Sequence, residues 1–134
     1  MGFLDELSEE IRLNGIDDYP PDGGLMANEI RDGAGDEVTA LFESSGGPGE
    51  RVQDVPGTKY AEQIVQVQCR SRSQQTARSR CYQIYNLFNG RGSENIGGTY
   101  YVSLDPLQAP FLLQRDENDR WIYAVNFTAL KVPS

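Results

Sequence analysis

The sequence contains no histidine, only two cysteines and only two lysines among its 134 residues. Histidine is the most common general base and a frequent metal ligand, so its absence lowers the expectation of catalysis and excludes a Ser-His-Asp triad. A Ser-Lys pair would have to use Lys59 or Lys131, and neither lies in a motif. The residues therefore indicate no catalytic, metal-binding or cofactor-binding site.

Long apolar runs are also absent. No run approaches the roughly 18 residues that a membrane-spanning helix needs, and the acidic N-terminus resembles no signal peptide. We therefore expect no membrane association, and synthesis in the cytoplasm, where reducing conditions favour free thiols for Cys69 and Cys81. A disulfide between them stays open as an alternative, because the segments that carry them are expected to be in contact.

The charge is divided unevenly along the chain. Residues 1–50 hold 13 acidic and 2 basic side chains, whereas residues 51–134 hold 7 acidic and 10 basic ones. Residues 63–93 contain five arginines and no acid. The two halves can neutralise each other within the fold or between subunits, or the arginines can bind nucleic acid. No aromatic platform or DNA-binding signature accompanies the arginines, which favours neutralisation.

Residues 64–88 are the most clearly patterned part of the chain. Val65, Val67 and Cys69 alternate with polar residues, which predicts a half-buried strand. Beyond Ser73, a suitable N-cap, the apolar spacing changes to that of one face of a helix. The residues on that face are Ala77, Cys81, Ile84 and Phe88. A strand that leads directly into a helix over about residues 73–89 is expected, with the two apolar faces in contact.

The remaining segments complete an α+β prediction. An N-terminal helix ends near Asn14-Gly15, with its apolar stripe opposed by acids: Asp5, Glu6, Glu9 and Glu10. A short piece from Leu25 to Arg31 is predicted to form one or two helical turns. Further strands are predicted over residues 38–43, 100–105, 111–115 and 121–130, with Tyr100, Val102 and Leu104 sharing one face. We predict one domain over residues 1–134, with a mostly antiparallel sheet of about five strands and both helices on one face.

Two irregular segments stand out. Ser44 to Lys59 contains six glycine or proline residues and is predicted to be a long loop, of the kind that is usually functional or disordered. Asp116, Glu117 and Asp119 lie in the turn of a predicted hairpin. As a calcium loop this ligand set is incomplete, so a solvated turn is the simpler interpretation.

The order of these elements and several short signatures resemble the tail terminator proteins of long-tailed bacteriophages, a family also labelled minor capsid or tail completion proteins. The similarity covers about residues 38–131. Its signatures are LFESSGG at 41–47, Tyr60, IVQVQCRSR at 64–72, the helix with Ala77, Tyr82, Ile84 and Leu87, QAPFLL at 108–113, DENDR at 116–120 and Asn126-Phe127.

The resemblance implies a structural virion protein at the head–tail junction. Such proteins usually form a homohexameric ring on the last ring of tail tube protein, end tube polymerisation and present a surface to the connector or stopper protein of the neck. DNA passes through the channel without specific binding, and no cofactor, metal or catalytic residue is implied.

We expect the interfaces to involve the arginines of the strand–helix unit, the loop and the acidic turn. The candidate residues are Arg70, Arg72, Arg78, Arg80, Gly46, Gly47, Pro48, Gly49, Glu50, Arg51, Asp116, Glu117 and Asp119. The alternatives are another neck component, such as a head completion or connector protein, and a nucleic-acid-binding regulator that uses the arginine-bearing helix. A metal-assisted hydrolase built on the acidic turns ranks third.

Overall fold

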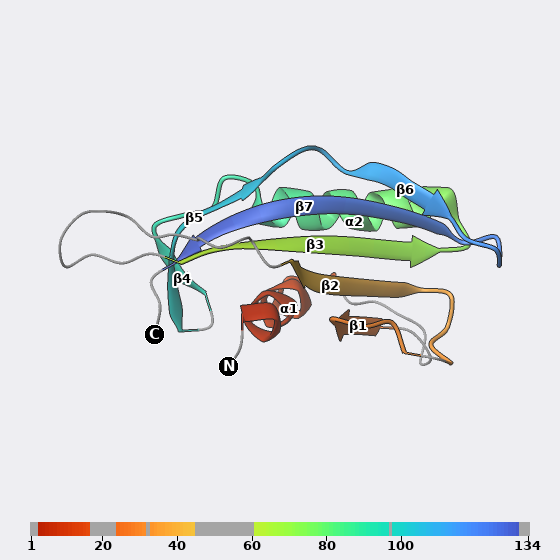
Figure 1. Ribbon diagram of the computed structural model, residues 1–134, viewed down its shortest axis with the longest axis horizontal. Helices are drawn as coiled ribbons and strands as arrows, with labels where there is room; N and C mark the ends of the chain where they lie inside the picture. Colours follow the sequence, from red (N-terminus) through yellow and green to blue (C-terminus); the bar gives the residue numbers. More distant parts are fainter. Residues whose placement is uncertain (1–2, 17–23, 32, 45–60, 97, 132–134) are drawn as a thin grey trace.

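The computed structural model describes residues 3–16, 24–31, 33–44, 61–96 and 98–131 (Figure 1). Within these ranges the chain forms two helices and seven strands. In chain order they are α1 (Phe3–Leu13), β1 (Gly24–Ala27), β2 (Val38–Ser44), β3 (Ala61–Ser71), α2 (Gln74–Phe88), β4 (Glu94–Ile96), β5 (Thr99–Pro106), β6 (Phe111–Arg115) and β7 (Trp121–Lys131). No helix among the described residues is long and apolar enough to cross a membrane.

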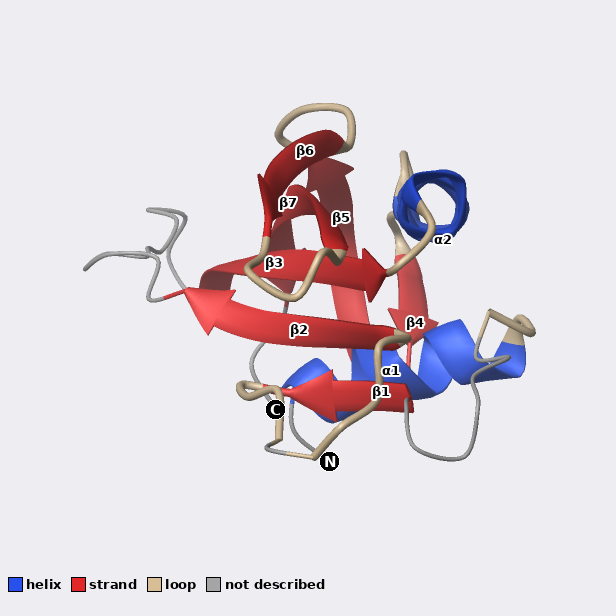
Figure 2. Cartoon of the chain, turned by 90° about the vertical axis from the view of Figure 1, so that its right-hand side faces the viewer, coloured by secondary structure: helices blue, strands red, loops and turns tan. Residues whose placement is uncertain are grey.

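The strands form one curled sheet in the order β1-β2-β3-β7-β5-β4, and β6 pairs with β7 (Figure 2). β5 lies along the C-terminal half of β7 and β6 along its N-terminal half. Every pairing is antiparallel except that between β1 and β2. The predicted α+β class and the mostly antiparallel pairing are confirmed, but five strands were too few because β1 and β4 were missed.

The segment predicted as a short helix at Leu25 to Arg31 is instead a strand over its first part. Gly24 and Asn28, with φ values of 131° and 61°, bracket β1 with backbone conformations that a helix does not contain. Main-chain pairing with β2 fixes this segment as a strand, and Met26 is buried beside Val38 and Ala40. Local helical preference in so short a piece is too weak to resist such pairing.

The predicted strand–helix unit is confirmed. Ser73 caps α2, because its Oγ accepts a hydrogen bond from the Thr76 amide at 3.2 Å. The four apolar residues of the predicted helix face are all buried against β3, β5 and β7. Phe88 meets Phe127 edge-to-face, with 5.7 Å between ring centroids. Leu4, Leu7 and Ile11 of α1 enter the same core, so both helices cover one face of the sheet.

The two cysteines lie inside this core as free thiols. The Thr39 hydroxyl donates to Cys69 Sγ at 3.7 Å. A hydrogen bond to Cys69, together with burial, raises the pKa of the Cys81 thiol. Neither cysteine is exposed, so both act as small core side chains.

β5 departs from the predicted alternation. Tyr101 and Leu104 are buried, whereas Tyr100 is exposed. The reason is a register shift between Tyr101 and Ser103 in the pairing with β7, which changes the face on which later residues lie. Sequence alternation alone cannot show where such a bulge falls.

Candidate interaction surfaces

A cluster of charged residues lies where β3 ends and β7 begins. Asp36, just before β2, accepts a hydrogen bond from Arg72 Nε at 2.7 Å and lies 3.5 Å from Arg120 Nη1. The hydrogen bond from Arg72 lowers the pKa of Asp36, and the same contact raises the pKa of Arg72. Glu37 follows, 3.3 Å from Arg80 Nη1 on α2. These acids of the N-terminal half therefore meet arginines of the second half within one chain.

Arg70 lies beneath this cluster rather than on the surface. Arg70 is only 7% exposed, and its Nη2 donates a hydrogen bond to the Gly35 carbonyl oxygen at 2.6 Å. Its Nε is buried without a hydrogen-bond partner among the described residues. Burial lowers the pKa of Arg70. Of the four candidate arginines, Arg70 therefore offers the least surface to a partner.

Arg78 differs from the other three candidates. It is exposed on α2, and its guanidinium carbon lies 4.8 Å from the centre of the Tyr82 ring. Tyr82 in turn meets Tyr85 edge-to-face at 5.9 Å. Within the described ranges no carboxylate pairs with Arg78, so its charge is the one of the four that is most available to another molecule.

The acidic turn between β6 and β7 is organised by its first residue. Asp116 Oδ1 accepts from the Asn118 and Arg120 amides, each at 3.0 Å, and Oδ2 accepts from Arg120 Nε at 2.9 Å. Partial burial opposes ionisation of Asp116, but these hydrogen bonds outweigh it and lower its pKa. Asp119 has φ of 60° in the turn. Asp116 is thus a structural residue, and only Glu117 and Asp119 point to solvent as exposed candidates.

Two acids that were predicted to lie opposite the apolar stripe of α1 make contacts with residues of other elements. Glu6 is 4% exposed and accepts hydrogen bonds from Thr99 Oγ1 at 2.6 Å and from the Tyr101 hydroxyl at 2.9 Å. The pKa of the Tyr101 hydroxyl is raised mainly by burial and further by its hydrogen bond to Glu6. Glu10 lies 2.8 Å from Arg91, whose hydrogen bonds to Glu94 and Glu10 raise its pKa. These contacts fasten α1 to β4 and β5, and no local sequence signal marks them.

The six loop candidates, Gly46, Gly47, Pro48, Gly49, Glu50 and Arg51, lie outside the described residues. They stay predictions.

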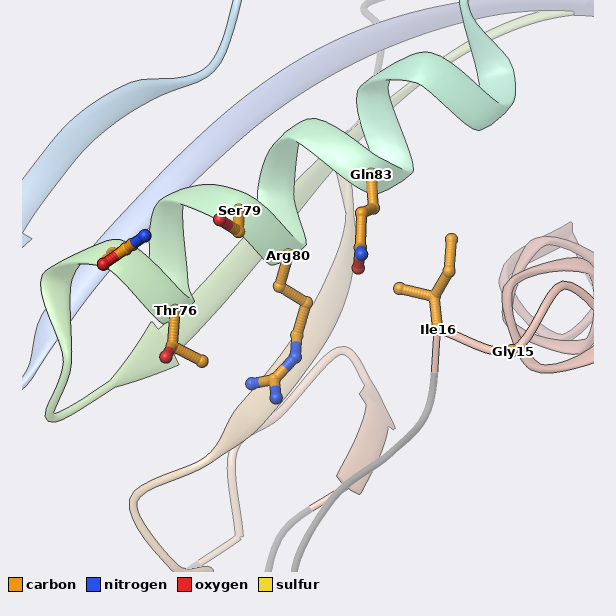
Figure 3. Close-up of a pocket in the computed structure, with 7 residues that line it drawn as sticks. Gly15, Ile16, Thr76, Ser79, Arg80 and Gln83 are labelled. Atoms are coloured by element: carbon orange, nitrogen blue, oxygen red, sulfur yellow. The ribbon is translucent and has the colours of Figure 1, made fainter.

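A groove lies between the end of α1 and the exposed face of α2 (Figure 3). Two adjoining hollows of about 400 and 440 Å³ share Gly15, Ile16 and Gln83. In Figure 3 Thr76 and Arg80 project from α2 on the side that faces Ile16. The lining offers hydroxyl and amide groups to a polar partner.

Exposed apolar side chains lie at and just before β6, in residues that were not among the predicted interface residues. Leu112 and Leu113 are 44% and 40% exposed, and Leu107 in the connection before β6 is 57% exposed. These leucines are candidates for contact with another protein. The signal in the sequence was the Leu-Leu pair within the strand predicted over residues 111–115.

Most of the described charged residues make contacts within the chain, and two exposed leucines, Leu112 and Leu113, lie on the marginal strand β6. Comparison with known families identifies the chain as a member of the bacteriophage tail terminator protein family, which it matches over residues 11–133. It is thus a structural protein of a phage-type tail, as the sequence resemblance implied.

A solved structure shares the fold. A chain in a structure titled "Virion of native gene transfer agent (GTA) particle" is 15% identical, with a TM-score of 0.66 over 98% of this chain and 95% of that chain. No curated protein gives a significant match to the sequence.

Proposed function

We propose that the protein forms a homohexameric ring at the head-proximal end of the phage tail tube, ends tube polymerisation and joins the tail to the neck. The observation that carries this proposal is the family match, which spans nearly the whole chain. The fold likeness to a chain in the virion of a gene transfer agent particle agrees with a place in the virion. We further propose that residues 1–134 act as one domain, with the tube protein and a neck connector or stopper as partners.

The internal charge pairs modify the expected chemistry of ring formation. Arg72 and Arg80 are paired with Asp36 and Glu37 of their own chain. Fewer charges are therefore available than the sequence suggested for attraction between the acidic half of one subunit and the basic half of its neighbour. The same pairing weakens the nucleic-acid alternative, since phosphate contacts need arginines that are not already neutralised. In the proposed ring, DNA passes without specific binding.

The test is a phage in which the gene for this protein is deleted. We expect tails longer than those of the parent and of variable length, with few joined to heads, in negatively stained lysates. Expression of the protein from a plasmid should restore uniform tails. Uniform tails of parental length without the protein would contradict termination, and normal free tails beside unfilled or leaking heads would favour the alternative of a head completion protein.

A further inference from the structure

Five strands share one ladder at the end of the sheet where β7 begins. A single row of paired residues crosses all five, through Gly24, Val38, Arg70, Ile122 and Gln114. In this part of the sheet the order is β1-β2-β3-β7-β6, so β1 and β6 are its two margins. Figures 1 and 2 both show β6 and β1 on opposite sides of the molecule at this end.

β6 is a marginal strand with an open edge and exposed apolar side chains. Only its edge toward β7 is paired among the described residues, and four of its five residues are exposed. Natural proteins usually protect an open edge with lysine, proline, inward-pointing charge or a β-bulge. β6 has no lysine or proline within its five residues, and although its pairing with β7 shifts register between Leu112 and Gln114, it still exposes Leu112 and Leu113. Such an edge favours the addition of another strand.

β1 is a suitable complement. No described strand pairs with its outer edge, and Ala27 at its end is exposed. β1 is parallel to β2, whereas β3, β7 and β6 follow with alternating direction, so β6 runs opposite to β1. If neighbouring copies are related by rotation about an axis along the strands, β6 of one copy meets β1 of the next in antiparallel orientation. Antiparallel pairing is the slightly more stable arrangement. Antiparallel addition brings the end of β6 to the start of β1.

We propose that the partner of β6 is a second copy of this chain, which adds its β1 edge to β6 so that the sheet continues from subunit to subunit. This proposal rests on the proposed ring and names the surfaces that build it. The contact joins two different margins head to tail, and its repetition by a rotation that closes gives the proposed ring. Pairing of β6 with β6 would instead give a two-fold dimer and stop there.

Cross-linking between single-cysteine variants tests which margins meet. Cys69 and Cys81 are fully buried, so an added surface thiol reacts preferentially. We would mix Leu112→Cys with Ala27→Cys proteins, allow subunits to exchange and add a short bis-maleimide. The proposal expects a covalent dimer from the mixture and none from either variant alone. A dimer from Leu112→Cys alone, or equal yield from a control mixture of Leu112→Cys with Leu13→Cys, would overturn it.

A second measurement separates this proposal from the proposed function. The double variant Leu112→Lys/Leu113→Lys should retain the circular dichroism spectrum and unfolding transition of a folded chain but elute at the mass of a monomer by light scattering. Leu13→Lys, at a 71% exposed position on α1, is the matched control and should keep the ring. A ring of undiminished mass from the double variant would overturn the β6–β1 contact, yet leave termination intact if the deletion phage still makes overlong tails.

Discussion

Replacement of Glu6 by alanine is expected to destabilise the folded chain strongly, although the residue lies on an acidic helix that looks solvent-exposed from its sequence. Glu6 is 4% exposed and accepts two hydrogen bonds, from Thr99 and from Tyr101. A hydrogen bond to a charged group contributes about 1.5–3 kcal/mol net. The alanine variant also relieves the cost of burying a carboxylate, so the lower end of the range applies to each bond.

The expected total is therefore a loss of roughly 3 kcal/mol in the free energy of unfolding. For a chain of this size that corresponds to a fall of roughly 10 °C in Tm. The assay is urea unfolding followed by circular dichroism at several protein concentrations, because assembly would otherwise add to the apparent stability. Glu6→Gln keeps one acceptor oxygen and should lose less than the alanine variant.

Asp5→Ala is the matched control, since Asp5 is an exposed acid in the same first turn of α1. It should change the free energy of unfolding by no more than about 0.5 kcal/mol. If Glu6→Ala were as mild as Asp5→Ala, the buried carboxylate would not be what fastens α1 to β5, and the reasoning would be refuted.

Three further predictions address the turn, the core and the loop. The pKa of Asp116 is lowered in the folded chain, so the ionised carboxylate stabilises the fold above its ordinary pKa of 3.8, and this stabilisation is lost as the pH falls through the lower pKa of the folded state. The difference in urea midpoint between the parent and Asp116→Asn should therefore shrink as the pH falls below 3.8. A difference that stays constant with pH would contradict this prediction. Phe88→Ala should lower the free energy of unfolding by about 3–5 kcal/mol because it leaves a cavity beside Phe127, whereas Gln83→Ala on the exposed face of α2 should be nearly neutral. Deletion of residues 46–55, predicted from sequence to be loop, should leave the chain folded but give tails of uncontrolled length; parental tail lengths would refute a role in termination.

The sequence predicted best where one pattern is long and local. The apolar residues of β3 alternate with polar ones, and those of α2 recur at spacings of four, three and four; each pattern extends over several residues. The apolar faces of both elements point into one core. Neutralisation of the arginines by the acidic half was also anticipated as one alternative. The sequence could not say whether this occurs within or between chains; the contacts of Arg72 with Asp36 and of Arg80 with Glu37 place it within the chain.

The errors arose where distant contacts decide the structure. β1 and β4 have four and three residues, too few for a periodic pattern, and they are strands because β2 and β5 pair with them. Glu6 is buried by partners more than ninety residues away in the chain. The bulge in β5 depends on the register with β7. None of these features leaves a mark in the local sequence.

The most direct test of the central claim is a reconstruction of the purified virion at its head–tail junction. The account predicts one hexameric ring of this chain between the last ring of tail tube protein and the neck, with β6 of each copy beside β1 of the next. Density for the chain elsewhere in the particle, or its absence from the junction, would contradict the account.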